Sequence, residues 1–292
     1  MTYDLYIGDR SFSSWSLRGW LMFARFGLPV RTHMVGLYDG TMREDLSALA
    51  PARLVPVMRT PEGTVVADTL AMAETLHERH PDAGLWPADP ALRALARWLV
   101  AEMHSGFGAL RGDCAMQLLY RWDGFAPSDA VLADIDRVQQ LWATARAASG
   151  SDTPWLFGDY SLADVFYAPV AARIAGYGLA VGPEAQAYVD AHLAQPDFRR
   201  WRAMGLTKSY DPVPYALDLP TSAWPGPAPI PARAVDSGPS VNETCPYSGD
   251  PVTHFLETGG KVFGFCNAFC RDKTVNDPAA WPKFTALLDS TS

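Results

Sequence analysis

The stretch YDLYIGDRSFSSWSLRGWLMFARF, residues 3–26, decides the fold of the first part of the chain. Its beginning, Tyr3–Ile7, is rich in strand-forming residues and ends at a glycine. The polar, turn-like residues Asp9–Ser14 follow. Leu17–Phe26 then carries apolar side chains at helical spacing until Gly27 ends the pattern. The stretch therefore predicts a strand, a polar turn and a helix in immediate succession.

The residues after this helix continue the alternation of strands and helices. Pro56 lies inside one apolar run, where a proline fits a strand only at an edge or in a special peptide geometry. The order strand-helix-strand-helix-strand-strand-helix is that of the thioredoxin fold, so we expect a thioredoxin-like α/β domain over residues 1–82. The other expected elements are strands at Val30–Val35, Leu54–Met58 and Val65–Val66, and helices at Leu46–Ala50 and Thr69–His80.

From Pro90 the pattern changes to amphipathic helices, which predicts an all-α domain over residues 88–210. After Asp211 prolines become dense and the periodicity is lost, which is typical of a linker, here residues 211–243. A small module with cysteines, residues 244–288, completes the expected division. The expected helices are Ala91–Met103, Asp129–Ala148, Leu162–Ile174, Pro183–His192 and Phe198–Met204.

The bulk composition excludes several classes of protein. The chain has 292 residues, of which 48% are hydrophobic and 19% charged, so it has ample material for a core. Its net charge of −8 argues against nucleic acid and anionic membranes as partners. The N-terminus lacks a signal-peptide pattern and no apolar run reaches about 18 residues, so we expect a cytoplasmic protein without a membrane span.

The segment Ser13–Arg18, SSWSLR, is the most informative part of the first domain. It brings hydroxyl groups and free backbone N–H groups to the start of a helix, where the electropositive end favours an anion. A thiol held there loses its proton more easily, because the thiolate gains the helix field and a hydroxyl hydrogen bond. Simple capping of the helix by serine is the alternative interpretation.

Three further features suit a peptide-like ligand in the same domain. Val55 precedes Pro56 at the place of the cis-proline of thioredoxin-like folds, where an exposed backbone can pair with a ligand. Asp68 and Thr69 open the next helix, so that Asp68 can take an ammonium group and the helix end a carboxylate. Arg53 is a candidate for a second carboxylate. An edge proline, a helix cap and a solvated arginine are the respective alternatives.

Together these pieces resemble the cytosolic glutathione S-transferases over about residues 3–210, and among them the zeta type with its motif Ser-Ser-Cys-x-x-Arg. Here Trp15 replaces the cysteine of that motif, which places thiol-dependent chemistry in doubt. The resemblance implies that Ser13, with Ser14 as second choice, stabilises the glutathione thiolate. It also implies that Val55 pairs with the cysteinyl backbone and that Asp68-Thr69 recognises the γ-glutamyl group. The implied glutathione-binding residues are Trp15, Arg53, Val55, Pro56, Asp68 and Thr69.

The helical domain is expected to contribute one wall of the substrate pocket and a capping motif that stabilises the fold. By the same resemblance, the helix that ends near His104 lines the electrophile pocket, with Phe107 close by and Arg111 as a candidate for a carboxylate. A structural histidine is the alternative for His104. Ser161 and Asp164 have the spacing of a capping box, which we interpret as a folding element.

Three of the four cysteines lie near the C-terminus, and they predict a metal site. Cys266 follows a predicted strand, Cys270 lies one helical turn later, and Cys245 opens a turn twenty-one positions before Cys266, so three thiolates can converge. The spacing resembles the TRASH/YHS class of metal knuckles. We expect zinc ahead of Cu(I), with His254, Asp250, a water or another residue as fourth ligand. A Cys266–Cys270 redox pair and a metal-free vestige are the alternatives.

The sequence thus predicts a homodimeric glutathione transferase with glutathione as co-substrate and a small electrophile of undetermined identity. Glutathione-dependent cis–trans isomerisation of an unsaturated diacid is one alternative, with Arg18 and Arg111 as its carboxylate-binding candidates. A metal-binding or metal-sensing protein on a transferase scaffold is another. A third is a relative in fold alone that binds a protein partner. The remaining cysteine, Cys114, is expected to be a buried packing residue.

Overall fold

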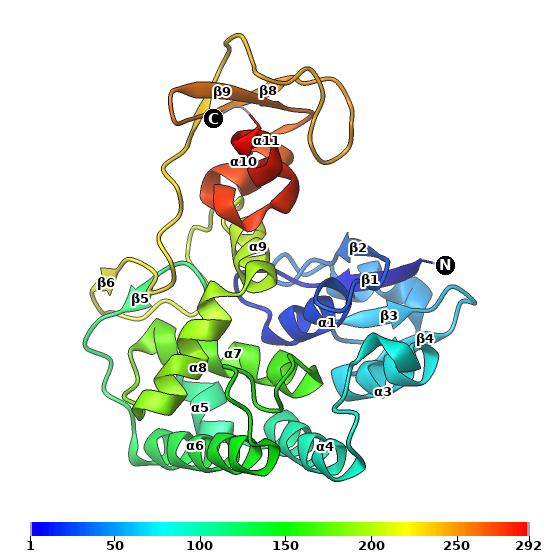
Figure 1. The fold of residues 1–292 in the computed structure, drawn as a ribbon, viewed down its shortest axis with the longest axis vertical. Coiled ribbons are helices and arrows are strands. Elements are labelled where there is room, and N and C mark those ends of the chain that lie inside the picture. The colour runs from blue at the N-terminus through cyan, green and yellow to red at the C-terminus, as the bar shows by residue number, and fades with distance from the viewer. Residues whose placement is uncertain (1, 291–292) are drawn as a thin grey trace. The chain divides into compact units, whose positions relative to one another are not determined.

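The computed structural model describes residues 2–290, which group into two compact units (Figure 1). The larger unit comprises Met1–Leu193 and Tyr215–Pro225, and the smaller unit comprises Ala194–Pro214 and Gly226–Ser292. The boundaries of these units differ from the predicted domain boundaries, because the predicted linker is divided between the two units. The division at residues 82, 88, 210, 243 and 288 stays a prediction.

The larger unit begins with a four-stranded sheet of order β2-β1-β3-β4, as the first stretch predicts. Strand β1 pairs in parallel with β2 and antiparallel with β3, and β3 pairs antiparallel with β4. This thioredoxin-like arrangement is confirmed; the helix expected at Leu46–Ala50 is a 3-10 turn, preceded by the short helix α2. The elements are β1 (Tyr3–Ile7), α1 (Ser14–Ala24), β2 (Val30–Met34), α2 (Met42–Asp45), the 3-10 turn Ser47–Leu49, β3 (Val57–Arg59), β4 (Val65–Ala67) and α3 (Thr69–Arg79).

Helix α1 packs closely on the end of the sheet that carries the site. Leu17 and Leu21 are fully buried, as the helical spacing of the apolar residues requires. A Cβ atom at Gly19 would lie 2.9 Å from Cγ of Pro56, so only glycine allows this approach of helix and strand. The turn before α1 is thereby fixed next to the residues that precede β3.

The helical part of the larger unit is built around α7, whose residues are all buried. Helices α1 and α4 both contact α7, so α7 joins the sheet domain to the other helices. Ser161 and Asp164 form the predicted capping box at its start. Burial raises the pKa of Asp164 to about 6. The helices are α4 (Pro90–Ser105), α5 (Gly108–Asp113), α6 (Asp129–Ser149), α7 (Leu162–Tyr177) and α8 (Pro183–Ala194), followed by the smaller unit's α9 (Pro196–Gly205).

Segment 211–243 is more ordered than its proline content predicts. Strand β6 (Thr221–Ser222) pairs with β5 (Arg121–Trp122) within the larger unit. Strand β7 (Arg233–Val235) pairs with β8 within the smaller unit. Backbone hydrogen bonds with partners far away in sequence hold both parts, which sequence periodicity cannot reveal.

The smaller unit is a three-stranded antiparallel sheet with helices and its own core. Leu256, Phe263 and Phe284 are fully buried there, and Ala203 of α9 belongs to the same core. An ion pair of 2.7 Å between Arg199 and Asp277 also joins α9 to the rest of this unit. Its further elements are β8 (His254–Thr258), β9 (Lys261–Phe265), α10 (Ala268–Asn276), the 3-10 turn Pro278–Ala280 and α11 (Pro282–Asp289).

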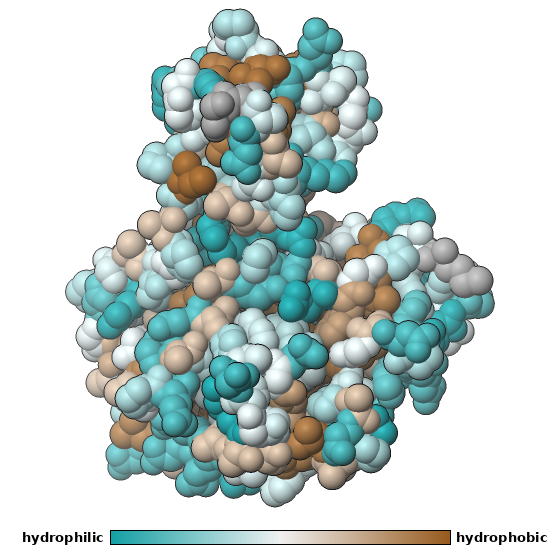
Figure 2. Space-filling view, in the orientation of Figure 1, coloured by the Kyte–Doolittle hydropathy of each residue, from teal (hydrophilic) through white to brown (hydrophobic). Residues whose placement is uncertain are grey.

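Within residues 2–290, no helix combines the length and the apolar character that crossing a membrane requires. The surface in Figure 2 is mostly hydrophilic or neutral, with hydrophobic residues in separate groups between the polar ones.

Candidate active site

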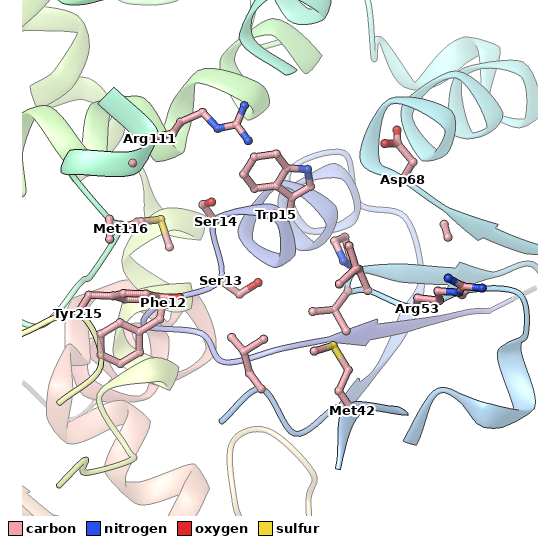
Figure 3. A pocket seen from close by; sticks show the side chains of 18 of the residues that line it. Phe12, Ser13, Ser14, Trp15, Met42, Arg53, Asp68, Arg111, Met116 and Tyr215 are labelled. Carbon is pink, nitrogen blue, oxygen red and sulfur yellow. The ribbon is translucent and has the colours of Figure 1, made fainter. Parts of the chain in front are cut away.

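The larger unit contains a cavity of about 700 Å³ at the carboxyl end of β1 and the start of α1 (Figure 3). Its walls come from the turn before α1, the loop before β3, the start of α3, the end of α5, Arg173 of α7, and Tyr215. Arginines 53, 111 and 173 are the cations of the lining, and Asp68 is its carboxylate. The remaining lining residues are Phe12, Ser13, Ser14, Trp15, Leu37, Met42, Pro51, Ala52, Leu54, Val55, Pro56, Ala67, Gly112, Ala115, Met116 and Tyr215.

The two serines at the start of α1 have different partners. The Ser13 side chain caps α1 by accepting the Ser16 N–H at 3.3 Å, and its hydroxyl donates to Oγ of Ser16 at 2.7 Å. Oγ of Ser14 instead accepts an N–H of Arg173 at 3.4 Å. Capping therefore does occur here, as the alternative interpretation expected, and both side chains still line the cavity.

Trp15 takes the place where the zeta motif has its cysteine, and its ring lies between two guanidinium groups. The guanidinium carbons of Arg18 and Arg111 lie 4.4 and 4.5 Å from its ring centroid. Arg18 is fully buried, and none of its guanidinium nitrogens has a hydrogen-bond partner among the described residues. Aromatic faces thus supply much of the stabilisation that a buried guanidinium needs.

The arginines around the serines make this part of the cavity cationic. Burial, together with the charges of Arg173 and Arg111, lowers the pKa of Arg18 to about 9. Burial and the charge of Arg111 lower the pKa of Arg173 to about 10. All three still carry a positive charge at neutral pH, so this wall attracts an anion.

Asp68 is held by its own helix and by a histidine. One carboxylate oxygen accepts the N–H groups of Leu70 and Ala71 at 2.7 and 3.3 Å, and the other lies 3.1 Å from Nε2 of His104. A carboxylate has about four acceptor positions, so it can still accept from an ammonium group. Thr69 is fully buried and does not line the cavity, and its Oγ1 has no hydrogen-bond partner among the described residues.

The structure brings most of the predicted site residues together. Val55 and Pro56, joined by a cis peptide bond, face the cavity from one side, and exposed Arg53 lies next to them. Phe107 and His104 lie behind the lining. The lining residues among the predicted ones are Ser13, Ser14, Trp15, Arg53, Val55, Pro56, Asp68 and Arg111.

Sequence reasoning missed several residues of the cavity lining, among them Phe12, Arg173 and Tyr215. Arg173 lies in a helix that is otherwise apolar from Val165 to Ile174, and a single charge in such a helix is the signal that could have found it. Tyr215 lies in a proline-rich segment without periodicity, where no signal marks it.

A second cluster lies in the smaller unit, where Cys245, Cys266 and Cys270 converge. Their sulfur atoms all lie within 4.8 Å of one another, and those of Cys266 and Cys270 are 3.9 Å apart. Among the described residues, neither His254 nor Asp250 contributes a ligand atom to this group of three sulfur atoms. Spacing of this kind suits thiolate ligands of one soft or borderline metal ion.

Two thiols of this cluster, Cys245 and Cys270, lie in different electrostatic environments. Burial raises the pKa of Cys245, but backbone N–H groups of Cys266, Ser248 and Tyr247 outweigh it and lower that pKa to about 7. Burial raises the pKa of Cys270 to about 12, as it does that of Cys114 in the larger unit. Cys114 is fully buried, as expected of a packing residue.

Comparison with known proteins agrees with this geometry. The family described as "Glutathione S-transferase, N-terminal domain" matches residues 12–79. A maleylacetoacetate isomerase of Pseudomonas aeruginosa is 30% identical over 210 residues, which covers 67% of this chain and 93% of that protein. A probable maleylacetoacetate isomerase of Caenorhabditis elegans is 29% identical over 180 residues, covering 61% and 82%.

Solved structures agree in fold. A glutathione transferase homologue from Burkholderia GL BGR1, determined with bound glutathione, superposes with a TM-score of 0.54. It is 23% identical, and the match covers 71% of this chain and all of that one. From the fold, the matched sequence domain and the extent of the similarity to the bacterial isomerase, we conclude that the chain belongs to the glutathione S-transferase family, whose members are glutathione-dependent enzymes.

Proposed function

We propose that this protein binds glutathione in the cavity of the larger unit and activates its thiol at Ser13 for attack on a small electrophile. One observation carries the proposal. A single cavity presents the Ser13 hydroxyl, the backbone beside Pro56 and the Asp68 carboxylate, which match a thiol, a peptide group and an ammonium group.

Each part of glutathione has a proposed partner. The backbone of Val55 pairs with the cysteinyl residue, and Asp68 accepts from the γ-glutamyl ammonium group. The start of α3 at Thr69 faces the adjacent carboxylate, which the helix field favours. Arg53 pairs with the glycyl carboxylate, and Trp15 packs against the tripeptide beside Ser13.

Activation of the thiol follows from the hydrogen bonds at the start of α1. The Ser13 hydroxyl has one hydrogen, which Ser16 accepts in the free protein. When glutathione binds, this hydroxyl turns to donate to the sulfur, while Ser16 keeps the N–H of Gly8 at 3.0 Å. The thiol proton passes to water, and the thiolate is stabilised by the hydroxyl and by the helix field.

The cationic wall supports a second substrate that carries negative charge. Arg111 and Arg173 line the cavity next to Ser14, so an unsaturated acid can orient its carboxylate there. Arg18 raises the positive potential from behind this wall without lining the cavity. His104 and Phe107 do not contact the substrate directly in this proposal. His104 acts through its contact with Asp68, and Phe107 acts through the backbone. The names of the two isomerase relatives support glutathione-dependent cis–trans isomerisation as the alternative reaction.

Calorimetric titration with glutathione tests the proposal. We expect binding in the micromolar-to-millimolar range for the wild type and loss of binding in Asp68→Ala. Because that substitution also removes the cap of α3, Asp68→Ser supplies a cap without a charge and is expected to bind as weakly as Asp68→Ala. Asp89→Ala is the matched control, since Asp89 caps α4 in the same way through Ala91 and Leu92. Absence of binding at about 10 mM glutathione would refute the proposal.

Product analysis separates conjugation from isomerisation. In conjugation the thiolate forms a C–S bond that persists, and glutathione is consumed. In isomerisation the thiolate adds to a C=C bond, the resulting single bond rotates, and the thiolate leaves, so glutathione is regenerated. Maleylacetoacetate with one equivalent of glutathione distinguishes the two, because only conjugation removes free thiol.

We also propose that Cys245, Cys266 and Cys270 hold one structural metal ion in the smaller unit, zinc ahead of Cu(I). The mutual proximity of the three sulfur atoms supports this. Elemental analysis of freshly purified protein is expected to find about one equivalent of metal per chain. A metal-free protein with an oxidised Cys266–Cys270 pair would favour the redox alternative. The homodimer expected from the family also stays a prediction, to be checked by light scattering.

A further inference from the structure

One wall of the cavity is aromatic, and part of it comes from a segment that follows the helical domain. The Tyr215 ring lies 6.0 Å from the ring of Phe12 and 6.3 Å from that of Tyr38, between centroids. Phe12 is buried, whereas 52% of Tyr215 is exposed at the cavity rim. Figure 3 shows the Phe12 and Tyr215 rings side by side, with Met116 nearby and Ser13 next to them. A ligand that packs on Tyr215 therefore removes apolar surface from water.

The segment Tyr215–Pro225, which we call the strap, is anchored at its far end. Its strand β6 pairs with β5, the N–H of Asp123 donates to the carbonyl of Pro220 at 2.8 Å, and the Ser222 hydroxyl donates to Asp123 at 2.9 Å. Tyr215 itself has φ of 57°, in the left-handed region that a tyrosine rarely adopts. Such a conformation persists only where the surroundings determine it, and such residues concentrate at ligand sites.

We propose that the strap completes the second-substrate site and that Tyr215 is its specificity-determining residue, selecting electrophiles with a flat aromatic ring. This inference rests on the proposed function, because the ring must lie next to the glutathione sulfur. Three features together carry it: the rings of Phe12 and Tyr215 offer an aromatic wall, Tyr215 is exposed enough to gain from a ligand, and the anchored strap holds it in place.

The wall selects by stacking and apolar contact. An aromatic ring packed on Tyr215 gains an offset or edge-to-face contact that an alkyl group of similar reactivity does not. The reacting carbon then lies towards Ser13, and polar substituents lie towards Arg111 and Arg173, which line the same cavity. The inferred substrate class is therefore an aromatic electrophile, with preference for one that carries an anionic or strongly polar group.

Calorimetry with two glutathione thioethers tests this without any need for turnover. S-benzylglutathione carries a ring on the sulfur, and S-methylglutathione carries none. We expect the wild type to bind the benzyl compound about 10-fold more tightly, and Tyr215→Ala to remove most of this difference. Tyr215→Phe keeps the ring and is expected to preserve the preference. Leu132→Ala removes another exposed apolar side chain, from α6 and outside the cavity, and should change neither affinity.

A kinetic pair extends the test to the reaction. Benzylideneacetone and ethylideneacetone are both α,β-unsaturated ketones; the thiolate forms a C–S bond at the β-carbon, the C=C electrons pass to the ketone oxygen, and water supplies the proton. Tyr215→Ala is expected to lower kcat/KM about 10-fold for the aromatic ketone and less than about 2-fold for the other.

The outcomes separate the two hypotheses. If the wild type binds neither thioether nor glutathione, the proposed function fails. If it binds glutathione but has no preference for the benzyl compound, or if Tyr215→Ala retains that preference, the assignment of Tyr215 is overturned while the proposed function stands.

Discussion

The two candidate sites are both built where a short helix begins, yet they suit ligands of opposite charge. At the start of α1, Ser13 caps the helix, and arginines 111 and 173 line the cavity beside it. At the start of α10, Asn267 caps the helix, and three thiols converge beside it. The same local geometry is thus proposed to hold an anion in one unit and a cation in the other.

The difference teaches that the surrounding side chains, not the helix start, decide the ligand. Helix N-termini favour negative charge in both cases. In the larger unit the anion comes from outside, since the protein supplies mainly cations. In the smaller unit the protein can supply the negative charge itself, as thiolates, which suits the proposed metal cation.

The largest effect is expected from removing one thiol of the cysteine cluster, which should abolish the proposed metal binding. Cys266→Ser and Cys270→Ser are each expected to abolish stoichiometric metal, because two remaining thiolates hold a structural ion poorly and its binding free energy is on the order of 10 kcal/mol. Elemental analysis measures this. Cys114→Ala is the control and should retain the metal. Full metal content in both serine variants would show that the cysteine cluster is not the binding site.

Substitution of Ser13 tests the other half of the comparison. Ser13→Ala is expected to lower kcat/KM about 100-fold, the usual effect of removing a hydrogen-bond donor to a developing anion, and to raise the pKa of the bound thiol in a UV titration. Ser128→Ala, which removes the cap of α6, controls for the loss of a helix cap. If Ser14→Ala instead of Ser13→Ala produced the loss, the second serine would be the activating residue.

The pH dependence of the unfolding free energy tests a buried carboxyl group of the larger unit, that of Asp164. Asp164 has no cation partner among residues 2–290, and its pKa of about 6 in the folded state lies above its ordinary value near 4. The folded state therefore binds more protons in this window, and the stability that Asp164 contributes below about pH 4 is lost as the pH rises through 6. Between about pH 4 and about pH 7, the free energy of unfolding of the wild type should fall by about 3 kcal/mol relative to that of Asp164→Asn.

Urea titrations of the two proteins at about pH 4 and about pH 7 measure this difference. Comparison with the variant removes the opposite contribution of paired carboxyls such as that of Glu102, whose pKa Arg137 lowers. A pH-independent difference would mean that Asp164 titrates normally.

The smallest effect is expected from Arg53→Ala. Arg53 is exposed, so its pair with a glycyl carboxylate resembles a surface ion pair worth up to about 1 kcal/mol. The dissociation constant for glutathione should rise about 3-fold at low salt and less at high salt. Equal affinities of variant and wild type at low salt would remove Arg53 from the site.

Local patterns predicted much of this molecule. Alternation and helical spacing located β1, α1, α4, α6 and α7, and the Ser161–Asp164 spacing predicted a capping box that the structure contains. The spacing of Cys266 and Cys270 predicted two converging thiols. Helix α5 and strands β5 and β6 were missed, because they are short and depend on partners far away along the chain.

The sequence by itself therefore determined the longer elements, the serine-bearing helix start and the Cys266–Cys270 pair, because each depends on neighbours within a few residues. Only the tertiary structure decided that Arg173 reaches Ser14, that Arg111 lies over the ring of Trp15, and that Tyr215 returns to the cavity. These contacts join residues that are distant along the chain. They form because packing of α7 and pairing of β6 fix both partners, and periodicity carries no record of such pairings.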